Sequence, residues 1–213
     1  MESPVRGGTR WRRFAVVMVP SVAATAAIGV ALAQGALAAS FAVSGQQFKV
    51  SAATLHGEGF VQYGNIDVEH NGTPHPVAVS GFNSADITDL CQSVVVPTPI
   101  GDVTMLLRAG RGKDKVTAKN LYIDLNQLDA DATFTGINIG VAAGNTDPKY
   151  APVEPSVGKD EKNGGASSFT QEAESVDLAG VQQTAWATSA GTFVLPGLSL
   201  SLHRGSGPSV ECY

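Results

Sequence analysis

Charged residues are scarce in this chain of 213 residues, and cysteine is almost absent. Only 15% of the residues are charged and 43% are hydrophobic, which is not the composition of a disordered acidic tail. A mean hydropathy of +0.06 argues against a membrane protein with many spans. Two cysteines are too few for a small disulfide-rich scaffold. The chain also lacks any window with a clear helical period, although 86–92 could form one helical turn.

The charges that are present divide the chain into two parts. The first 38 residues contain four arginines and one acid, whereas the remaining residues contain ten basic and eighteen acidic side chains. Residues 14–33 carry no charge and are mostly Ala, Val, Ile and Met. A basic start followed by an apolar run and small residues is typical of a secretory signal. We therefore expect residues 1–38 to be a signal peptide and residues 39–213 to be one exported, acidic domain.

The end of this leader contains a cleavage motif. Ala36 and Ala38 supply small residues at positions −3 and −1, which places cleavage after Ala38. The alternative is an uncleaved membrane anchor through residues 14–33, because about 20 apolar residues can span a bilayer. No cysteine lies near the site, so lipoprotein processing is excluded.

Cys91 and Cys212 permit only one intramolecular pairing. In an oxidising exterior this predicts a disulfide that ties the C-terminal tail to the middle of the chain. Two free, buried thiols are the alternative. Neither cysteine has a histidine nearby in the sequence, which makes a metal site at the pair unfavourable.

Alternation of apolar and polar residues predicts an all-β domain with a single antiparallel sheet system, either a sandwich or a groove-like layer. The turn at 71–74 (NGTP) predicts a hairpin between strands at 60–68 and 76–82. Further strands are expected at 92–96, 102–108, 121–126, 134–141, 175–178, 184–188, 192–195 and 198–202. In the last of these, Leu198, Leu200 and Leu202 alternate strictly with polar residues.

Residues 145–168 differ from the rest of the domain. Three prolines, clustered charges and a Gly-Gly pair predict a long mobile surface loop that contributes little to a core. A short motif, K-V-[S/T]-A-x-x-L, occurs twice in the chain, beginning at Lys49 and at Lys115. Two copies are compatible with a pseudo-repeated β layer and equally with coincidence.

The sequence contains no G-x-S-x-G nucleophile motif, which a secreted esterase would most simply show. A triad of Ser189, His203 and an acid remains open, because triads are defined by geometry rather than by order along the chain. Ser189 and His203 are thus weak catalytic candidates, and Ser189 is equally explained as a turn residue.

Two groups of side chains suggest metal ions. His70 and His75 flank the predicted hairpin turn near Asp67 and Glu69, where a metal could bind. Asp124, Asp129 and Asp131 could bind calcium, although their spacing is wrong for an EF-hand loop. Solvated side chains explain both groups better, and no metal or other cofactor is predicted.

An acidic domain with few and scattered basic residues is not expected to bind nucleic acid. The longest basic run contains Arg108, Arg111, Lys113, Lys115 and Lys119. It could approach anionic lipid headgroups or wall polymer, or be a basic loop by chance.

Four segments are distinctive: 35–46 (GALAASFAVSGQ), 59–63 (GFVQY), 119–124 (KNLYID) and 183–193 (QTAWATSAGTF). Together they resemble an uncharacterised family of exported actinobacterial proteins that are often labelled "cholesterol esterase". The label implies sterol-ester hydrolysis, but the resemblance assigns no catalytic residue. It also implies association with the cell envelope and with a small integral membrane protein as partner.

These observations lead to three expectations about function. The first is a non-catalytic binding or structural domain, which could hold a lipid or other hydrophobic ligand between apolar sheet faces. The second is a lipid or sterol ester hydrolase with a non-standard serine nucleophile. The third is an assembly subunit that adds strands edge to edge, with an oligomeric state that the sequence leaves open.

Overall fold

The computed structural model describes residues 44–153 and 167–213 as one eight-stranded antiparallel sheet, which confirms the all-β prediction. Residues 40–213 form one compact unit. The predicted signal peptide and the central part of the predicted mobile loop lie outside the described residues. The elements are β1 (Phe48–Val68), β2 (Pro74–Thr88), β3 (Leu90–Thr98), β4 (Gly101–Ala109), β5 (Val116–Thr135), β6 (Asn138–Ala142), the 3₁₀ turn η1 (Ala143–Asn145), β7 (Phe169–Val194) and β8 (Ser199–Arg204).

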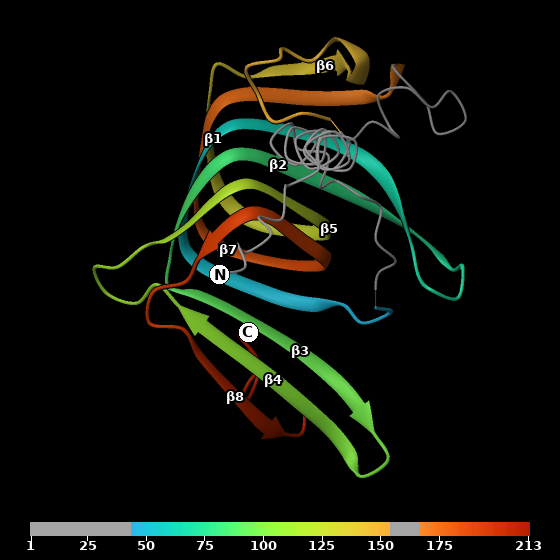
Figure 1. Ribbon diagram of the computed structural model, residues 1–213, viewed down its shortest axis with the longest axis vertical. Coiled ribbons are helices and arrows are strands. Elements are labelled where there is room, and N and C mark those ends of the chain that lie inside the picture. The colour runs from blue at the N-terminus through green and yellow to red at the C-terminus, as the bar shows by residue number, and fades with distance from the viewer. Residues whose placement is uncertain (1–43, 154–166) are drawn as a thin grey trace, which may run out of the picture. The chain divides into compact units, whose positions relative to one another are not determined.

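The sheet closes on itself. Its strand order is β6-β7-β5-β2-β1-β3-β4-β8, and β1 also pairs with β7 over Phe48–Tyr63. The four long strands β1, β2, β5 and β7 therefore form a closed ring, whose strongly bent ribbons are visible in Figure 1. We call this part the ring. Closure gives every ring strand a partner on both sides, so few backbone groups are left unpaired there.

A second part of the sheet, formed by β3, β4 and β8, extends beyond the ring (Figure 1). We call it the extension. β2 and β3 run along β1 in one register, because Thr54 pairs with Thr88 and Ser51 pairs with Cys91. Only Asp89, with a positive φ of 52°, separates the two strands. Residues 86–88 and 90–92 therefore belong to strands, and the single helical turn suggested for 86–92 is wrong.

Two apolar clusters lie on opposite faces of the ring strands. The inner cluster includes Leu55, Phe60, Phe82, Leu121 and Val176. The outer cluster is smaller and consists of Val61, Tyr63, Val77, Val79, Tyr122, Ala143 and Ala151. Because neighbouring side chains of a strand point to opposite faces, the alternation read in the sequence supplies both clusters.

The outer cluster depends on the segment after β6. Tyr150 and Ala151 are buried there, so the expectation that 145–168 contributes little to a core is wrong for these residues. Gly59 has a positive φ of 65°, and its carbonyl accepts a hydrogen bond from Ala151 N at 2.8 Å. A Cβ at Gly59 would lie 2.2 Å from the Asn83 amide nitrogen, so this anchor requires glycine.

Several predicted strands prove to be parts of longer ones. β5 includes 127–133, and β7 is one strand of 26 residues where three were expected. The β5–β7 register shifts between Leu125 and Gln127 and again between Asp129 and Asp131. Such bulges change which residues face inward, and they interrupt the period of two on which the sequence prediction relied.

Candidate functional site

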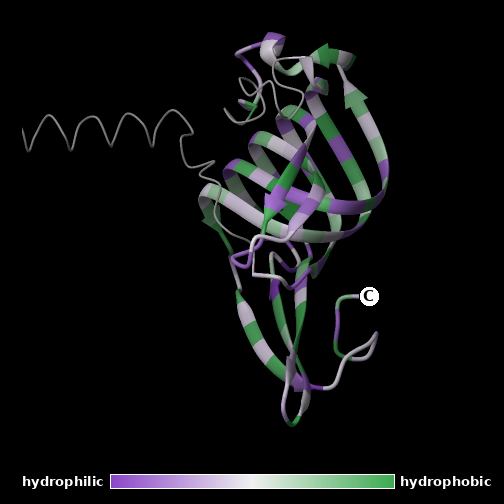
Figure 2. Ribbon diagram, turned by 90° about the vertical axis from the view of Figure 1, so that its right-hand side faces the viewer, coloured by the Kyte–Doolittle hydropathy of each residue, from purple (hydrophilic) through white to green (hydrophobic). Residues whose placement is uncertain are grey.

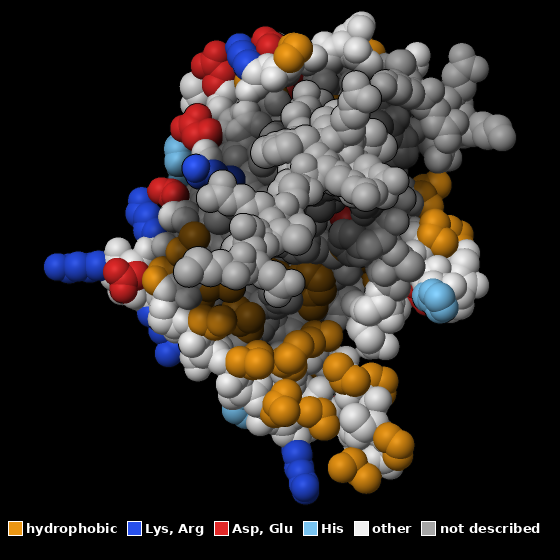
Figure 3. Space-filling model, in the orientation of Figure 1, with side chains coloured by type: hydrophobic (Ala, Val, Ile, Leu, Met, Phe, Trp, Pro, Cys, Tyr) orange, Lys and Arg blue, Asp and Glu red, His pale blue; other side chains and the backbone are white. Residues whose placement is uncertain are grey.

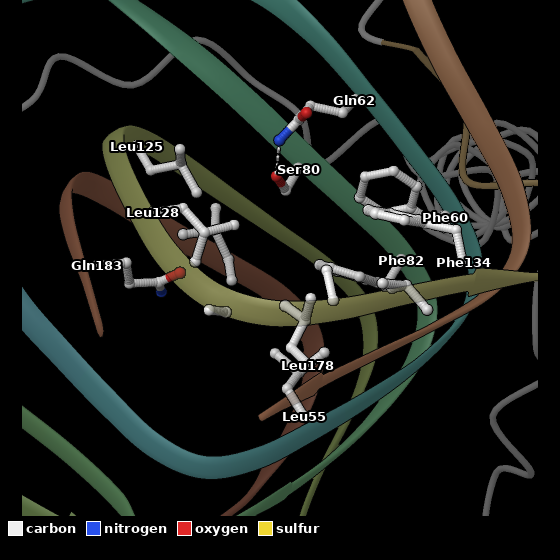
Figure 4. A pocket seen from close by; sticks show the side chains of 14 residues that line it. Leu55, Phe60, Gln62, Ser80, Phe82, Leu125, Leu128, Phe134, Leu178 and Gln183 are labelled. Carbon is white, nitrogen blue, oxygen red and sulfur yellow. Dashed lines mark hydrogen bonds between the residues drawn. The ribbon is translucent and has the colours of Figure 1, made fainter. Parts of the chain in front are cut away.

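The ring encloses an apolar cavity of about 190 Å³ that is partly open to solvent. Its walls come from all four ring strands (Figure 4). Most of the lining is aliphatic or aromatic: Leu55, Phe60, Phe82, Ile123, Leu125, Leu128, Ala130, Ala132, Phe134, Val176 and Leu178. The β5 bulges create much of this wall, because inward-facing residues change from Leu121, Ile123 and Leu125 to Leu128 and Phe134.

Polar groups occur at two places in this lining. Gln62 on β1 donates a hydrogen bond from Nε2 to Ser80 Oγ at 2.9 Å, and its Oε1 accepts one from Gln171 Nε2. This side of the cavity is therefore satisfied within the protein. Gln183 on β7 lies at the other place, and Figure 4 shows its amide pointing into the space surrounded by the labelled leucines.

Gln183 is the exception among the buried polar side chains of the described residues. The other five (Ser80, Ser93, Thr104, Thr170 and Glu172) all make side-chain hydrogen bonds within the protein. Gln183 as a residue is only 5% exposed, and its amide has no hydrogen-bond partner within 44–153 and 167–213. The amide is not among the fully enclosed polar atoms without a partner in these residues, so it faces the open space of the cavity. An amide in this position can form a hydrogen bond with whatever occupies the cavity.

The cavity continues toward the extension. A smaller space of about 30 Å³ shares Leu55, Ile123 and Gln183 with it and adds Leu90 and Gln92 of β3 and Phe193 of β7. Alternation along β3 carries this same face onward to Val94 and Val96 in the extension. Along each strand of the extension apolar residues alternate with others, as the coloured bands of Figure 2 show.

A second hollow lies on the opposite face, between residues 45–49, β3 and the C-terminal tail. It has a volume of about 560 Å³ and a mixed lining that includes Lys49, Trp186 and Glu211. Lys49 Nζ lies 2.8 Å from Glu211 Oε2 and donates to the Tyr213 carbonyl at 3.0 Å. The hydrogen bond from Lys49 is the main cause that lowers the pKa of the Glu211 carboxyl. The Glu211 side chain is only 8% exposed. These contacts use both charges to hold the tail against β1.

The disulfide prediction is confirmed. Cys91 and Cys212 are bonded with a Cα–Cα distance of 5.7 Å, and no free cysteine occurs in the described residues. The bond holds the tail on one face of the extension, where Cys212 N also donates to Ser93 Oγ at 3.1 Å. A structural disulfide indicates an oxidising, extracytoplasmic compartment.

The two weak catalytic candidates lie in different strands. Ser189 is on β7 opposite Tyr122, and His203 is on β8 opposite Thr104. His203 Nε2 is 2.9 Å from Ser201 Oγ on its own strand. No hydrogen bond joins Ser189, His203 and a carboxylate within the described residues. A triad through them therefore stays a prediction.

The histidines near the hairpin turn have other contacts. His75 Nε2 lies 2.6 Å from Glu69 Oε1, and its ring stacks on Trp186 with centroids 3.8 Å apart. His70 is exposed beside this pair. Asp129 accepts a hydrogen bond from Gln127 at 2.7 Å. Across the part of the chain that the structure describes, no group of three or more His, Cys, Asp or Glu side chains could hold a metal ion.

The basic run does not form a pocket. Arg108, Arg111, Lys113, Lys115 and Lys119 are all exposed, on the edge of β4, in the β4–β5 loop and on β5. Lys115 Nζ is 3.6 Å from Asp86 Oδ2, which partly neutralises the run. No helix among the described residues is long and apolar enough to cross a membrane.

Comparison with known protein families matches residues 44–213 to a single family, described as "Family of unknown function (DUF6230)". The chain belongs to the DUF6230 family. The match begins four residues before β1 and ends at residue 213, so the ring, the extension and the tail are all parts of the DUF6230 domain. Neither curated proteins nor solved structures give a match.

The sequence did not point to the cavity. Gln183 stands in the polar stretch Gln182-Gln183-Thr184, where nothing distinguishes an inward side chain from an outward one. The one available signal was the spacing of Leu125 and Leu128, which departs from alternation where β5 bulges.

Proposed function

We propose that this DUF6230 domain is a non-catalytic binding protein that takes an apolar chain with one polar group into the ring. The observation that carries the proposal is Gln183, whose amide faces an apolar cavity and has no hydrogen-bond partner within the described residues. A ligand hydroxyl, carboxyl or amide would supply the hydrogen bond that the protein does not. The aliphatic wall would hold the rest of the ligand.

The size of the cavity limits the ligand. An engineered apolar cavity of about 150 Å³ binds benzene, so about 190 Å³ suits one small apolar group or the end of a chain. Drug-sized ligands occupy roughly 300–1,000 Å³, which exceeds this space. A fatty acid or fatty alcohol that enters by its end fits better than a whole sterol ester.

A binding titration tests the proposal. We would titrate residues 40–213 with cis-parinaric acid, a thin fluorescent fatty acid, and displace it with decanoate or decanol. Saturable binding is expected, and Ala130→Leu should weaken it about tenfold or more because the added side chain fills the cavity. Ala53→Leu is the matched control, since Ala53 is exposed on β1 and does not line the cavity.

Absence of saturable binding, or equal affinity in wild type and Ala130→Leu, would refute the proposal. Mass spectrometry of protein purified under native conditions supplies an independent measurement. A co-purified lipid that is lost in Ala130→Leu and retained in Ala53→Leu supports a cavity ligand.

The second candidate is the ester hydrolase that the "cholesterol esterase" label of the resembling actinobacterial proteins implies, with Ser189 as nucleophile and His203 as base. Its test is turnover of short-chain and long-chain acyl esters by wild type, Ser189→Ala and His203→Ala. The proposed location is extracellular or at the cell envelope, with residues 14–33 either cleaved or retained as an anchor. The disulfide supports the extracytoplasmic part of this location.

A further inference from the structure

The extension has one covered face and one bare face. Thr104 and Ser93 are fully buried on the covered face, where Gly205 and Cys212 of the tail bond to them. The bare face is apolar, although it faces solvent. Leu200 and Leu202 on this face are 60% and 70% exposed, and Ile100 in the adjoining β3–β4 turn is 85% exposed.

Strand register places the bare residues together. Met105 pairs with Val94 on one side and with Leu202 on the other, and the next row contains Leu107 and Leu200. Three adjacent strands thus present one continuous apolar surface. Figure 3 shows hydrophobic side chains gathered over this part of the molecule. Contiguous exposed apolar patches on monomeric proteins mark interaction sites.

Charge distinguishes this face from the rest of the domain. Residues 39–213 carry an excess of eight acidic side chains, yet the bare faces of β3, β4 and β8 have no Asp or Glu. Asp102 points to the opposite face, where Ser206 donates to it at 3.1 Å. Arg204 follows Leu200 and Leu202 in the same alternation and stands at the rim of the apolar surface.

The same face leads into the ring. Leu90 and Gln92 line the inner space, and the next inward positions of β3 are Val94 and Val96 on the bare face. If a lipid layer covered this face, an apolar chain could move from it along β3 toward the cavity. Gln92 is the one polar side chain that β3 would place on this path.

We propose that the bare face of the extension docks on the surface of a lipid bilayer and that Arg204 contacts the headgroups. Exposed leucines and Ile100 enter the interfacial region, while an arginine at the rim of an apolar surface keeps its charge in water and is attracted to anionic lipid. The absence of carboxylates on the face removes the repulsion that the acidic domain would otherwise meet. This inference deepens the proposed function, because docking here places a lipid chain at the entrance to the cavity.

Vesicle flotation tests the docking. Residues 40–213 would be mixed with vesicles of phosphatidylcholine alone or with phosphatidylglycerol at one part in three. Leu200→Ser combined with Leu202→Ser should lower the bound fraction about tenfold or more. Ile66→Ser combined with Val68→Ser is the matched control, because both residues are exposed at the β1–β2 hairpin, away from the extension. Arg204→Gln should weaken binding only to the vesicles that contain phosphatidylglycerol.

The outcomes separate docking from cavity binding. Variants at Leu200 and Leu202 should still bind cis-parinaric acid in solution, whereas Ala130→Leu should still bind vesicles. Equal flotation of the two double variants would overturn the docking proposal and leave cavity binding intact. Sedimentation velocity showing a dimer that Leu200→Ser and Leu202→Ser dissociate, without vesicle binding by wild type, would also overturn it and assign the face to a second copy of the chain.

Discussion

The carboxylate of Asp177 on β7 lies 2.7 Å from Nδ1 of His56 on β1, directly across the pair of strands that closes the ring. The Glu58 carboxylate approaches the other ring nitrogen, Nε2, at 3.0 Å. Hydrogen bonds to Asp177 and then to Glu58 raise the pKa of His56 above its ordinary value of 6.5. With both nitrogens protonated, His56 donates to both carboxylates and strengthens the closure.

Ring closure should therefore depend on pH. Since the pKa of His56 is higher in the folded state, its contribution is complete below about 6.5 and is lost as pH rises through the folded value. His56→Gln should lower the free energy of unfolding at pH 5.5 by less than about 1 kcal/mol, because the group is half exposed, and by nothing at pH 9. Urea unfolding at the two pH values measures this, with His70→Gln as control. An equal loss at both pH values would contradict it.

Tyr122 should make the domain sensitive to alkali. Burial raises the pKa of its phenol from 10.0 to about 12, and the hydroxyl donates to the Pro152 carbonyl at 3.1 Å. Stability is complete below about pH 10 and falls as pH rises toward 12, because only the unfolded state ionises easily there. Titration of tyrosine absorbance at 295 nm should include a group that ionises late, near pH 12. Tyr122→Phe should remove this late group and lower stability at pH 7 by about 0.5–1.5 kcal/mol.

Loss of the Cys91–Cys212 bond should destabilise the whole domain. The two cysteines are 121 residues apart, and closing a loop of this size contributes about 4–5 kcal/mol in the chain-entropy model. The double variant Cys91→Ala, Cys212→Ala should unfold at much lower urea concentration. Hydrogen exchange should rise first at Thr104 and its neighbours, which the tail covers. Unchanged stability would mean that the tail is held by its other contacts alone.

Glu211 should stabilise the tail above acidic pH. Because its folded pKa is lowered, chiefly by the hydrogen bond from Lys49, its contribution is present above about 4.5 and is lost as pH falls through the folded value. Glu211→Gln should lower the free energy of unfolding by about 1–3 kcal/mol at pH 7 and by less at pH 3. A difference that grew on acidification would contradict the assignment.

Gln183→Leu should stabilise the protein and weaken ligand binding. Replacing this amide, which has no hydrogen-bond partner among the described residues, by an apolar side chain of similar size should raise the free energy of unfolding by up to about 1 kcal/mol. Gln62→Leu is the matched control, since it breaks hydrogen bonds with Ser80 and Gln171 and should destabilise. Thermal unfolding and displacement of cis-parinaric acid by decanol measure both effects. A less stable Gln183→Leu variant would mean that the amide has a structural role.

The fold class, the β1–β2 hairpin, the disulfide and the strand at Leu198–Leu202 could all be predicted, because each rests on local alternation, turn chemistry or cysteine count. The length of β7 could not be predicted. Gly180 has a positive φ of 62° in the middle of the strand, and a glycine within an alternating pattern is typical of a bulge or bend rather than of an uninterrupted strand. Bulges in β5 hid the continuity of that strand in the same way.

The candidate site was beyond prediction for a different reason. The cavity depends on pairing between β1 and β7, which are distant in the sequence, and alternation does not specify which strands pair. Burial of Gln183 becomes visible only when the ring is closed. The bare face could be predicted in part, because the sequence shows Leu198, Leu200 and Leu202 alternating with polar residues. The structure was needed to show that the tail covers the other face of the extension.

The closure of the ring also determines when the domain can fold. β1 begins the described sheet, yet its partner β7 lies near the end of the chain, where Ala185 pairs with Phe48. The last two residues include the cysteine that fastens the tail. Such long-range pairing is slow and cannot begin before β7 is available. Until then β1 and β5 each lack the partner that β7 supplies, so their backbone edges are free to pair with other chains during folding.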